Sequence, residues 1–145
     1  MPDVEYAFLA DAAEAVPGQK FSILGGGISR LAGRTFPLQH PHLALVVGLR
    51  VTAVEHDREH ALRFVLLAPD GNEVASAEGN VVAHGQGDGR DNVVTFAIDL
   101  WNLVLPAPGE YSLRVLVAGS ERKRLPLVVT PIVETPPPPE QRYLA

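Results

Sequence analysis

The chain has 145 residues, of which 46% are apolar and 20% charged, and its formal net charge is −5. This length and apolar content are typical of one soluble domain with its own hydrophobic core. Cysteine is absent, which excludes disulfides, thiolate zinc sites and a cysteine nucleophile, and favours a reducing compartment. The acidic balance argues against a nucleic-acid-binding surface.

The amino-terminal segment and the hydropathy pattern indicate where the protein resides. Asp3 and Glu5 stand where a secretory signal would carry Lys or Arg before an apolar run. The longest apolar run, residues 43–49, is far shorter than the roughly 18 residues that a membrane-spanning helix needs. We therefore expect a cytoplasmic protein without a membrane partner.

The first third of the chain predicts two strands and a crossing. Residues 3–10 fit either a helical face or a strand, and we predict a strand because it can pair with residues 21–30 across a turn at Pro17-Gly18. Residues 36–41 hold two prolines, which cannot donate to a ladder, so this segment is expected to cross between sheets.

The rest of the chain alternates apolar and polar residues between turn signals, as half-buried strands do. A hairpin turn is predicted at Pro69-Asp70-Gly71-Asn72, and a surface loop at residues 85–92, which contain no apolar side chain. The gaps leave no room for crossover helices. We predict an all-β, two-sheet antiparallel sandwich of about eight strands over residues 1–131, with alternating segments at 43–53, 62–66, 94–100, 111–117 and 125–129.

Residues 132–145 are rich in proline and predict an extended tail that cannot join the core. Such an arm can dock on a partner protein or on another copy of the chain, although a solvated terminus is the simpler reading. The candidate partner-binding residues are Pro136, Pro137, Pro138, Pro139, Tyr143 and Leu144.

Two histidine pairs are the weak metal-binding candidates. His56 and His60 are four residues apart, a spacing that brings two imidazoles to one metal ion on a helix. Their segment is short, wholly polar and lies between two strands, so a solvated turn is the expected structure. His40 and His42 form the second pair, with no third ligand in view. We therefore expect no bound metal and no cofactor.

Other polar or glycine-rich motifs lack part of the chemistry they resemble. Residues 87–93 partly match a calcium-binding repeat, but a single copy lacks half of the ligands. Residues 25–27 are three glycines without the Lys that follows a phosphate-binding loop, so we expect a bulge, with Gly26 or Gly27 facing a buried Trp101. No serine lies in a nucleophile elbow. The sequence therefore predicts that the protein is not an enzyme.

The single basic cluster, Arg122-Lys123-Arg124, follows Glu121. A phosphate site is one reading of such a cluster. A charged strand edge that resists pairing with other chains is the reading we prefer.

Two resemblances concern the architecture. Trp101-Asn102-Leu103 and the later Pro108-Gly109-Glu110-Tyr111 resemble the end of immunoglobulin-like sandwiches, in which the tyrosine packs across a corner. Ala10-Asp11-Ala12-Ala13-Glu14, with Lys20 leading into the glycines at 25–27, is similar to a family of small uncharacterised bacterial proteins. That resemblance implies a β-sandwich and transfers no catalytic residue.

The leading functional hypothesis is a non-catalytic protein-interaction or assembly module that uses the β-sandwich and the carboxy-terminal arm. A small-ligand or carbohydrate-binding sandwich, using loops 36–42 and 85–92, is the first alternative. It requires aromatic side chains on an exposed face. A metal-dependent hydrolase built on His56 and His60 is the second alternative.

Overall fold

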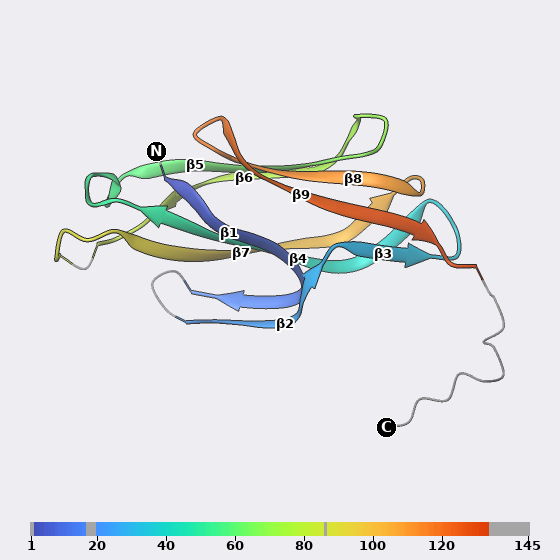
Figure 1. The fold of residues 1–145 in the computed structure, drawn as a ribbon, viewed down its shortest axis with the longest axis horizontal. Coiled ribbons are helices and arrows are strands. Elements are labelled where there is room, and N and C mark those ends of the chain that lie inside the picture. The colour runs from blue at the N-terminus through green and yellow to red at the C-terminus, as the bar shows by residue number, and fades with distance from the viewer. Residues whose placement is uncertain (1, 17–19, 86, 134–145) are drawn as a thin grey trace, which may run out of the picture.

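The computed structural model describes residues 2–16, 20–85 and 87–133, and these form nine strands and one short 3-10 helix (Figure 1). The all-β fold class is thereby confirmed. The elements are β1 (Asp3–Ala15), β2 (Phe21–Ile28), β3 (Arg30–Gly33), β4 (Leu38–Val51), η1 (Ala53–Glu55), β5 (Glu59–Leu67), β6 (Glu73–Val82), β7 (Asn92–Leu105), β8 (Gly109–Val117) and β9 (Ser120–Pro131).

The strands form two sheets that face each other. Sheet A has the order β2-β1-β4-β7, and sheet B has the order β3-β9-β8-β5-β6. One expected strand, residues 21–30, is divided between them, because β2 pairs with β1 in sheet A whereas β3 pairs with β9 in sheet B. The β3–β9 pair is parallel, so the expectation of purely antiparallel sheets was wrong at this position.

The main core lies between the two sheets and follows the predicted alternation. In β7 the alternation changes at Asn102, whose φ of 51° places it in the left-handed region, so that both Leu100 and Leu103 are buried. The buried core residues from the predicted strands include Leu43, Leu45, Val47, Leu49, Val51, Leu62, Phe64, Leu66, Val94, Leu100, Tyr111, Leu113, Val115, Val117, Leu127 and Val129.

The predicted tyrosine corner is present. Tyr111 is 2% exposed, and its hydroxyl donates to the carbonyl oxygen of Ala107 at 2.7 Å. The same hydroxyl oxygen accepts from the backbone N–H of Ala107 at 3.2 Å. The side chain thus joins the turn before β8 to the core, as in immunoglobulin-like sandwiches.

A second apolar layer lies on the outer face of sheet A. Figure 1 shows the second half of β1 and β2 running beneath the rest of this sheet. Ala44 and Val46 of β4 are fully buried although they lie outside the main core. The ring of Tyr6 lies 6.1 Å from the ring of Phe21 and occupies the space over Gly48, where a Cβ atom would overlap it. The β1–β2 hairpin therefore covers part of this face.

Three expectations about segments need correction or completion. The connection from β3 to β4 does cross between the sheets, with a cis Phe36–Pro37 bond, but His40 and Pro41 belong to β4. The strand β6 was not individually predicted, because its small and polar residues alternate weakly. The predicted turn at Pro17-Gly18 and the tail from residue 134, with all six candidate partner-binding residues, lie outside the described residues.

In the described part of the chain there is no apolar helix of the length that a bilayer crossing requires.

Candidate functional site

The first histidine pair lies at one end of the sandwich, after η1. His60 is already part of β5, and its Nε2 donates to the carbonyl oxygen of Glu55 at 2.8 Å. The ring of His56 packs against Gly85, and its Nε2 is buried with no hydrogen-bond partner among the described residues. The two imidazoles therefore have separate structural surroundings. No group of three metal-ligating side chains occurs within residues 2–16, 20–85 and 87–133.

A third histidine at the same end forms a side-chain contact that sequence spacing did not indicate. The Nδ1 atom of His84 lies 2.7 Å from Oδ1 of Asp57, and both side chains are more than 70% exposed. Asp57 has a φ of 60°, and its N–H donates to the carbonyl oxygen of Ala83, which ties the two loops together. Water surrounds this pair, so its contribution is small.

Glu55 is the acid at this end of the sandwich whose pKa its surroundings shift most. It is 8% exposed, and its Oε1 accepts hydrogen bonds from the N–H and the hydroxyl of Thr52, both at 2.8 Å. Burial alone would raise the pKa of this carboxyl, but hydrogen bonds, those from Thr52 among them, lower the pKa to about 2. The carboxylate closes a capping box at η1 and has a structural role.

The second histidine pair does not converge either. In the β4–β7 register His40 lies opposite the buried Leu103, whereas His42 lies opposite Trp101. Nδ1 of His42 donates to the carbonyl oxygen of Asp11 at 2.8 Å, and its Nε2 lies 2.7 Å from Oδ1 of Asp99. Both ring nitrogens of His42 are thus occupied, and neither is available to bind a metal ion or to take a proton from a substrate.

Trp101 was expected to be buried against the glycines, and this was wrong. Its side chain is 67% exposed, and its ring lies 4.1 Å from that of His42 on the outer face of sheet A. Gly25 instead accommodates the carboxylate of Asp11, and Gly26 packs against the side chain of Ile23. The alternation of β7 places Trp101 on the same face as Asp99, and this signal in the sequence favours an exposed ring.

The loop before β7 contains a hydrogen bond between two of its own residues. Residues 85 and 87–91 are irregular, as predicted, and β7 begins at Asn92. Oδ1 of Asp88 accepts from the N–H of Arg90 at 3.1 Å, which is a local turn interaction.

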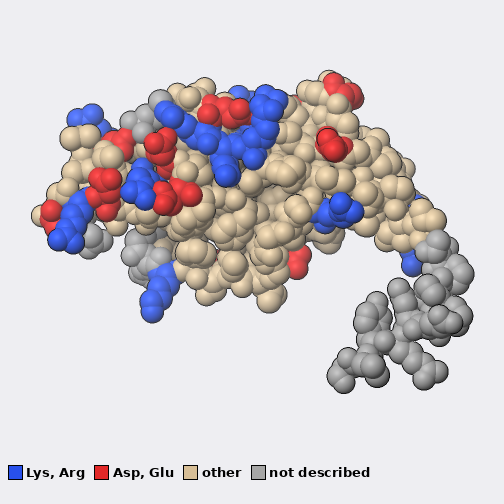
Figure 2. Space-filling model, in the orientation of Figure 1, with Lys and Arg blue, Asp and Glu red and all other residues tan. Residues whose placement is uncertain are grey.

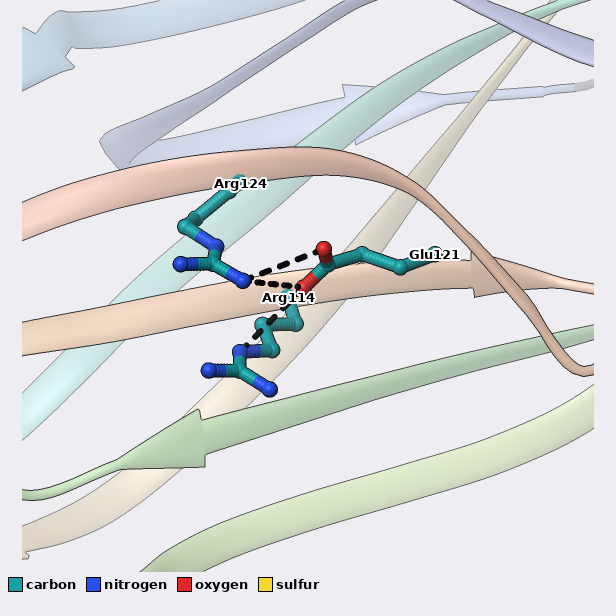
Figure 3. Close-up of polar contacts among 3 residues, drawn as sticks. All are labelled: Arg114, Glu121 and Arg124. Atoms are coloured by element: carbon teal, nitrogen blue, oxygen red, sulfur yellow. Dashed lines mark hydrogen bonds and ion pairs between the residues drawn. The ribbon is translucent and has the colours of Figure 1, made fainter. Parts of the chain in front are cut away.

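The basic cluster lies on the β8–β9 hairpin (Figure 2). Arg114 of β8 lies directly opposite Arg124 of β9, and Glu121 lies between the two guanidinium groups (Figure 3). Nη2 of Arg124 lies 3.2 Å from each carboxylate oxygen of Glu121, and Nε of Arg114 lies 3.2 Å from Oε1. One carboxylate thus offsets the repulsion of two facing arginines.

The same cluster protects an edge. β3 pairs only with residues 128–131 of β9, so no described strand pairs with the half of β9 that carries residues 121–124, although Arg122 forms an ion pair with Asp3 of β1. Charged side chains at such a position hinder pairing with another chain. The preferred reading from the sequence, a charged strand edge, agrees with this arrangement.

The open side of the sandwich, between β6 and β7, contains an apolar cleft of about 200 Å³. Both bordering strands are the last strands of their sheets. The cleft is mostly apolar, and its lining includes Leu62, Phe64, Val81, Phe96 and Ile98.

Among the described residues, the outer edge of β7 has less protection than the other sheet edges, with one break at positive φ near its end, at Asn102. β3 has only four residues, β2 is interrupted by Gly25 and Gly27 at positive φ, and β6 carries two glutamates. β7 has 14 residues with a single charged side chain, that of Asp99. Long apolar edges without Lys, Pro or a cover are sites of strand pairing with another chain. The β7 edge is therefore the candidate functional site.

Comparison with solved structures gives distant similarities. The alkylpurine DNA glycosylase AlkC of Pseudomonas fluorescens, bound to DNA containing an abasic site analog, is 12% identical with a TM-score of 0.44, over 86% of this chain and 30% of that one. The CARDB domain of a Pyrococcus furiosus protein, in complex with di-metal ions, is 11% identical with a TM-score of 0.36, over 88% and 91%. An immunoglobulin-like protein of Pseudomonas aeruginosa is 14% identical with a TM-score of 0.31, over 86% and 96%.

The chain thus spans less than a third of the glycosylase. No curated protein matches the sequence. One family matches residues 5–130, which are most of the chain and include nearly all of the described sandwich. The chain belongs to this family, DUF6941, a family of unknown function.

Proposed function

We propose that the protein is a non-catalytic interaction or assembly module that binds another protein chain. The observation that carries this proposal is the 14-residue edge of β7, with its single charge and the apolar cleft beside it. An extended segment of another chain can satisfy the free backbone groups of such an edge and cover the cleft.

The described polar groups support the non-catalytic part of the proposal. A histidine that acts as a general base needs a ring nitrogen that is free to accept a proton from the substrate. Both nitrogens of His42 are occupied, and His60 donates to a backbone carbonyl. The Asp57–His84 pair is more than 70% exposed, so it does not lie in an enclosed site.

The carboxy-terminal arm is the second element of the proposal. The sequence of this arm has four successive prolines at 136–139 followed by Tyr143 and Leu144, a composition suited to binding along another subunit. The cytoplasm is the compartment in which we expect this assembly to form.

Size-exclusion chromatography with light scattering tests the proposal on the full chain and on a chain that ends at Pro131. We expect the full chain to form a defined complex, either with itself or with a protein that co-purifies with it. A shorter chain that keeps the complex assigns binding to the sandwich, and one that loses it assigns binding to the arm. A protein that stays monomeric, and that chemical cross-linking in native cells leaves unlinked, would contradict the proposal.

The carbohydrate-binding alternative has one feature in its favour, the exposed ring of Trp101. Trp101 is the only tryptophan of the chain, so its fluorescence reports directly on any ligand that stacks on it. Saturable quenching by a monosaccharide or oligosaccharide, lost in Trp101→Ala, would establish this alternative in place of the interaction module.

A further inference from the structure

We infer that the partner of the β7 edge is a second copy of this chain, paired antiparallel through β7 about a two-fold axis at Ala97. This inference rests on the proposed function and names its partner. In a two-fold interface both copies contribute the same surface, so a single exposed edge per chain is sufficient to form a dimer. The two copies of sheet A then join into one continuous sheet.

The alternation of β7 limits the possible registers. Side chains opposite one another in an antiparallel pair share a face of the sheet. Val93, Thr95, Ala97, Asp99 and Trp101 lie on the outer face, and the residues between them face the core side. A two-fold axis normal to the sheet must therefore pass between a residue and its own copy.

Among the central residues, Ala97 gives the best match of side chains. With the axis at Ala97, Trp101 lies opposite Val93 of the second copy, and these side chains are 67% and 41% exposed in the single chain. With the axis at Phe96, Val93 instead lies opposite the charged Asp99. With the axis at Ile98, Trp101 lies opposite Thr95, which is already buried and bonded to Tyr6.

The same register suits the one charge of the strand. Asp99 lies opposite Thr95 of the second copy, so the two Asp99 carboxylates do not face each other. An axis at Asp99 would bring these like charges together, which destabilises a cross-strand pair.

The core side of the strand also gains a partner. Phe96 and Ile98 border the cleft and are only partly buried in the single chain. About an axis at Ala97, Phe96 of one copy lies opposite Ile98 of the other. Apolar side chains that are exposed at the open side of one sandwich thus cover those of the other, and the removal of this surface from water favours association.

Cysteine cross-linking tests the register, because the chain has no cysteine of its own. In full-length Ala97→Cys the two thiols face each other across the axis. Opposed Cα atoms in an antiparallel pair are about 4.5–5.5 Å apart, within the range of about 4.4–6.8 Å that a disulfide spans. With a mild oxidant we expect cross-linked dimers to form at least about tenfold faster than in Ser76→Cys, the control on the exposed face of β6.

A charge at the axis is the second test. Two lysines opposite each other in Ala97→Lys should raise the dissociation constant of the dimer at least about 30-fold, by analytical ultracentrifugation over a concentration series. Ser76→Lys places the same charge on the other edge strand and should leave dimerisation unchanged. Circular dichroism checks that each variant keeps its strands, and the small Ala97→Cys change retains a test if the lysine variant fails to fold.

The outcomes separate this inference from the proposed function. A protein that assembles, but whose Ala97→Cys variant cross-links no faster than Ser76→Cys, overturns the β7 dimer and leaves the interaction module standing. A wild-type protein that is monomeric at every concentration, and whose Ala97→Cys variant does not cross-link, also overturns the dimer. The proposed function is also contradicted in that case if cross-linking in native cells shows no other protein partner.

Discussion

Tyr111 holds the turn before β8 through its hydroxyl while its ring fills the core. Ser112, the next residue, is in a contrasting state, because its Oγ is buried without a hydrogen-bond partner among the described residues. A buried hydroxyl with partners stabilises the folded state, and one without partners costs free energy. Substitution of Tyr111 therefore tests the contribution of a bonded hydroxyl to stability, and substitution of Ser112 is the control.

Tyr111→Phe removes the two contacts with Ala107 and keeps the ring. We expect it to lower the free energy of unfolding by about 1–2 kcal/mol, measured by urea denaturation. Ser112→Ala should change it by less than about 0.5 kcal/mol or raise it. Equal decreases in the free energy of unfolding of the two variants would show that the hydrogen bonds of Tyr111 do not contribute to stability as proposed.

Glu55 provides a pH-dependent test at the same scale. Its pKa is lowered from the ordinary 4.5 to about 2 in the folded protein, so the unfolded chain takes up the proton first as the pH falls. The stabilisation is therefore complete above the unfolded pKa and is lost as the pH falls through the folded pKa.

Glu55→Gln should accordingly be less stable than the wild type by about 1–3 kcal/mol near neutral pH. Denaturant unfolding of both proteins between pH 7 and the acid limit measures the difference, which should shrink as the pH falls toward about 2. A difference that is constant with pH would show that the carboxylate charge is not the cause.

At the scale of elements, the β1–β2 hairpin depends on a glycine in the strand it covers. The ring of Tyr6 lies where a side chain of Gly48 would be, and the Tyr6 hydroxyl bonds to Thr95 on β7. One aromatic residue of β1 thus reaches across β4, the neighbouring strand, to β7, the next strand of sheet A. The hairpin and the outer face of the sheet are expected to unfold together.

Gly48→Ala tests this coupling. The added methyl overlaps the Tyr6 ring, so we expect a loss of about 2–3 kcal/mol in the free energy of unfolding. Gly79→Ala is the matched control in β6, where a Cβ meets no atom within 4 Å, and it should be neutral or slightly stabilising. If Gly48→Ala behaves as Gly79→Ala does, the Tyr6 ring is not fixed over the strand.

At the scale of the whole molecule, charge and apolar surface are segregated. Figure 2 shows charged side chains of both signs over the β8–β9 hairpin and at the left end of this view, while the lower part of the view has few of them. Trp101, Val93 and Leu24 are among the exposed large apolar residues of sheet A. An exposed apolar surface of this kind is where soluble proteins meet partners.

The single tryptophan reports on that surface without modification. In the dilute protein we expect the emission of an exposed indole, since Trp101 is 67% exposed. On concentration, the dimer through β7 should bury the ring against Val93 and shift the emission to shorter wavelength. The shift should be absent in Ala97→Lys, and a shift that persists in that variant would place the partner of Trp101 elsewhere.

The sequence by itself determined the fold class, most strands of the sandwich and the tyrosine corner, because period-two burial and turn residues are local signals. Tertiary structure alone decided which part of the outer face of sheet A is covered, so that Trp101 stays exposed, and that the strand at 21–30 divides between the sheets. It also decided that β7 is an edge strand. Strand order and the covering of a face depend on contacts between residues far apart in the chain, which alternation within one strand does not encode.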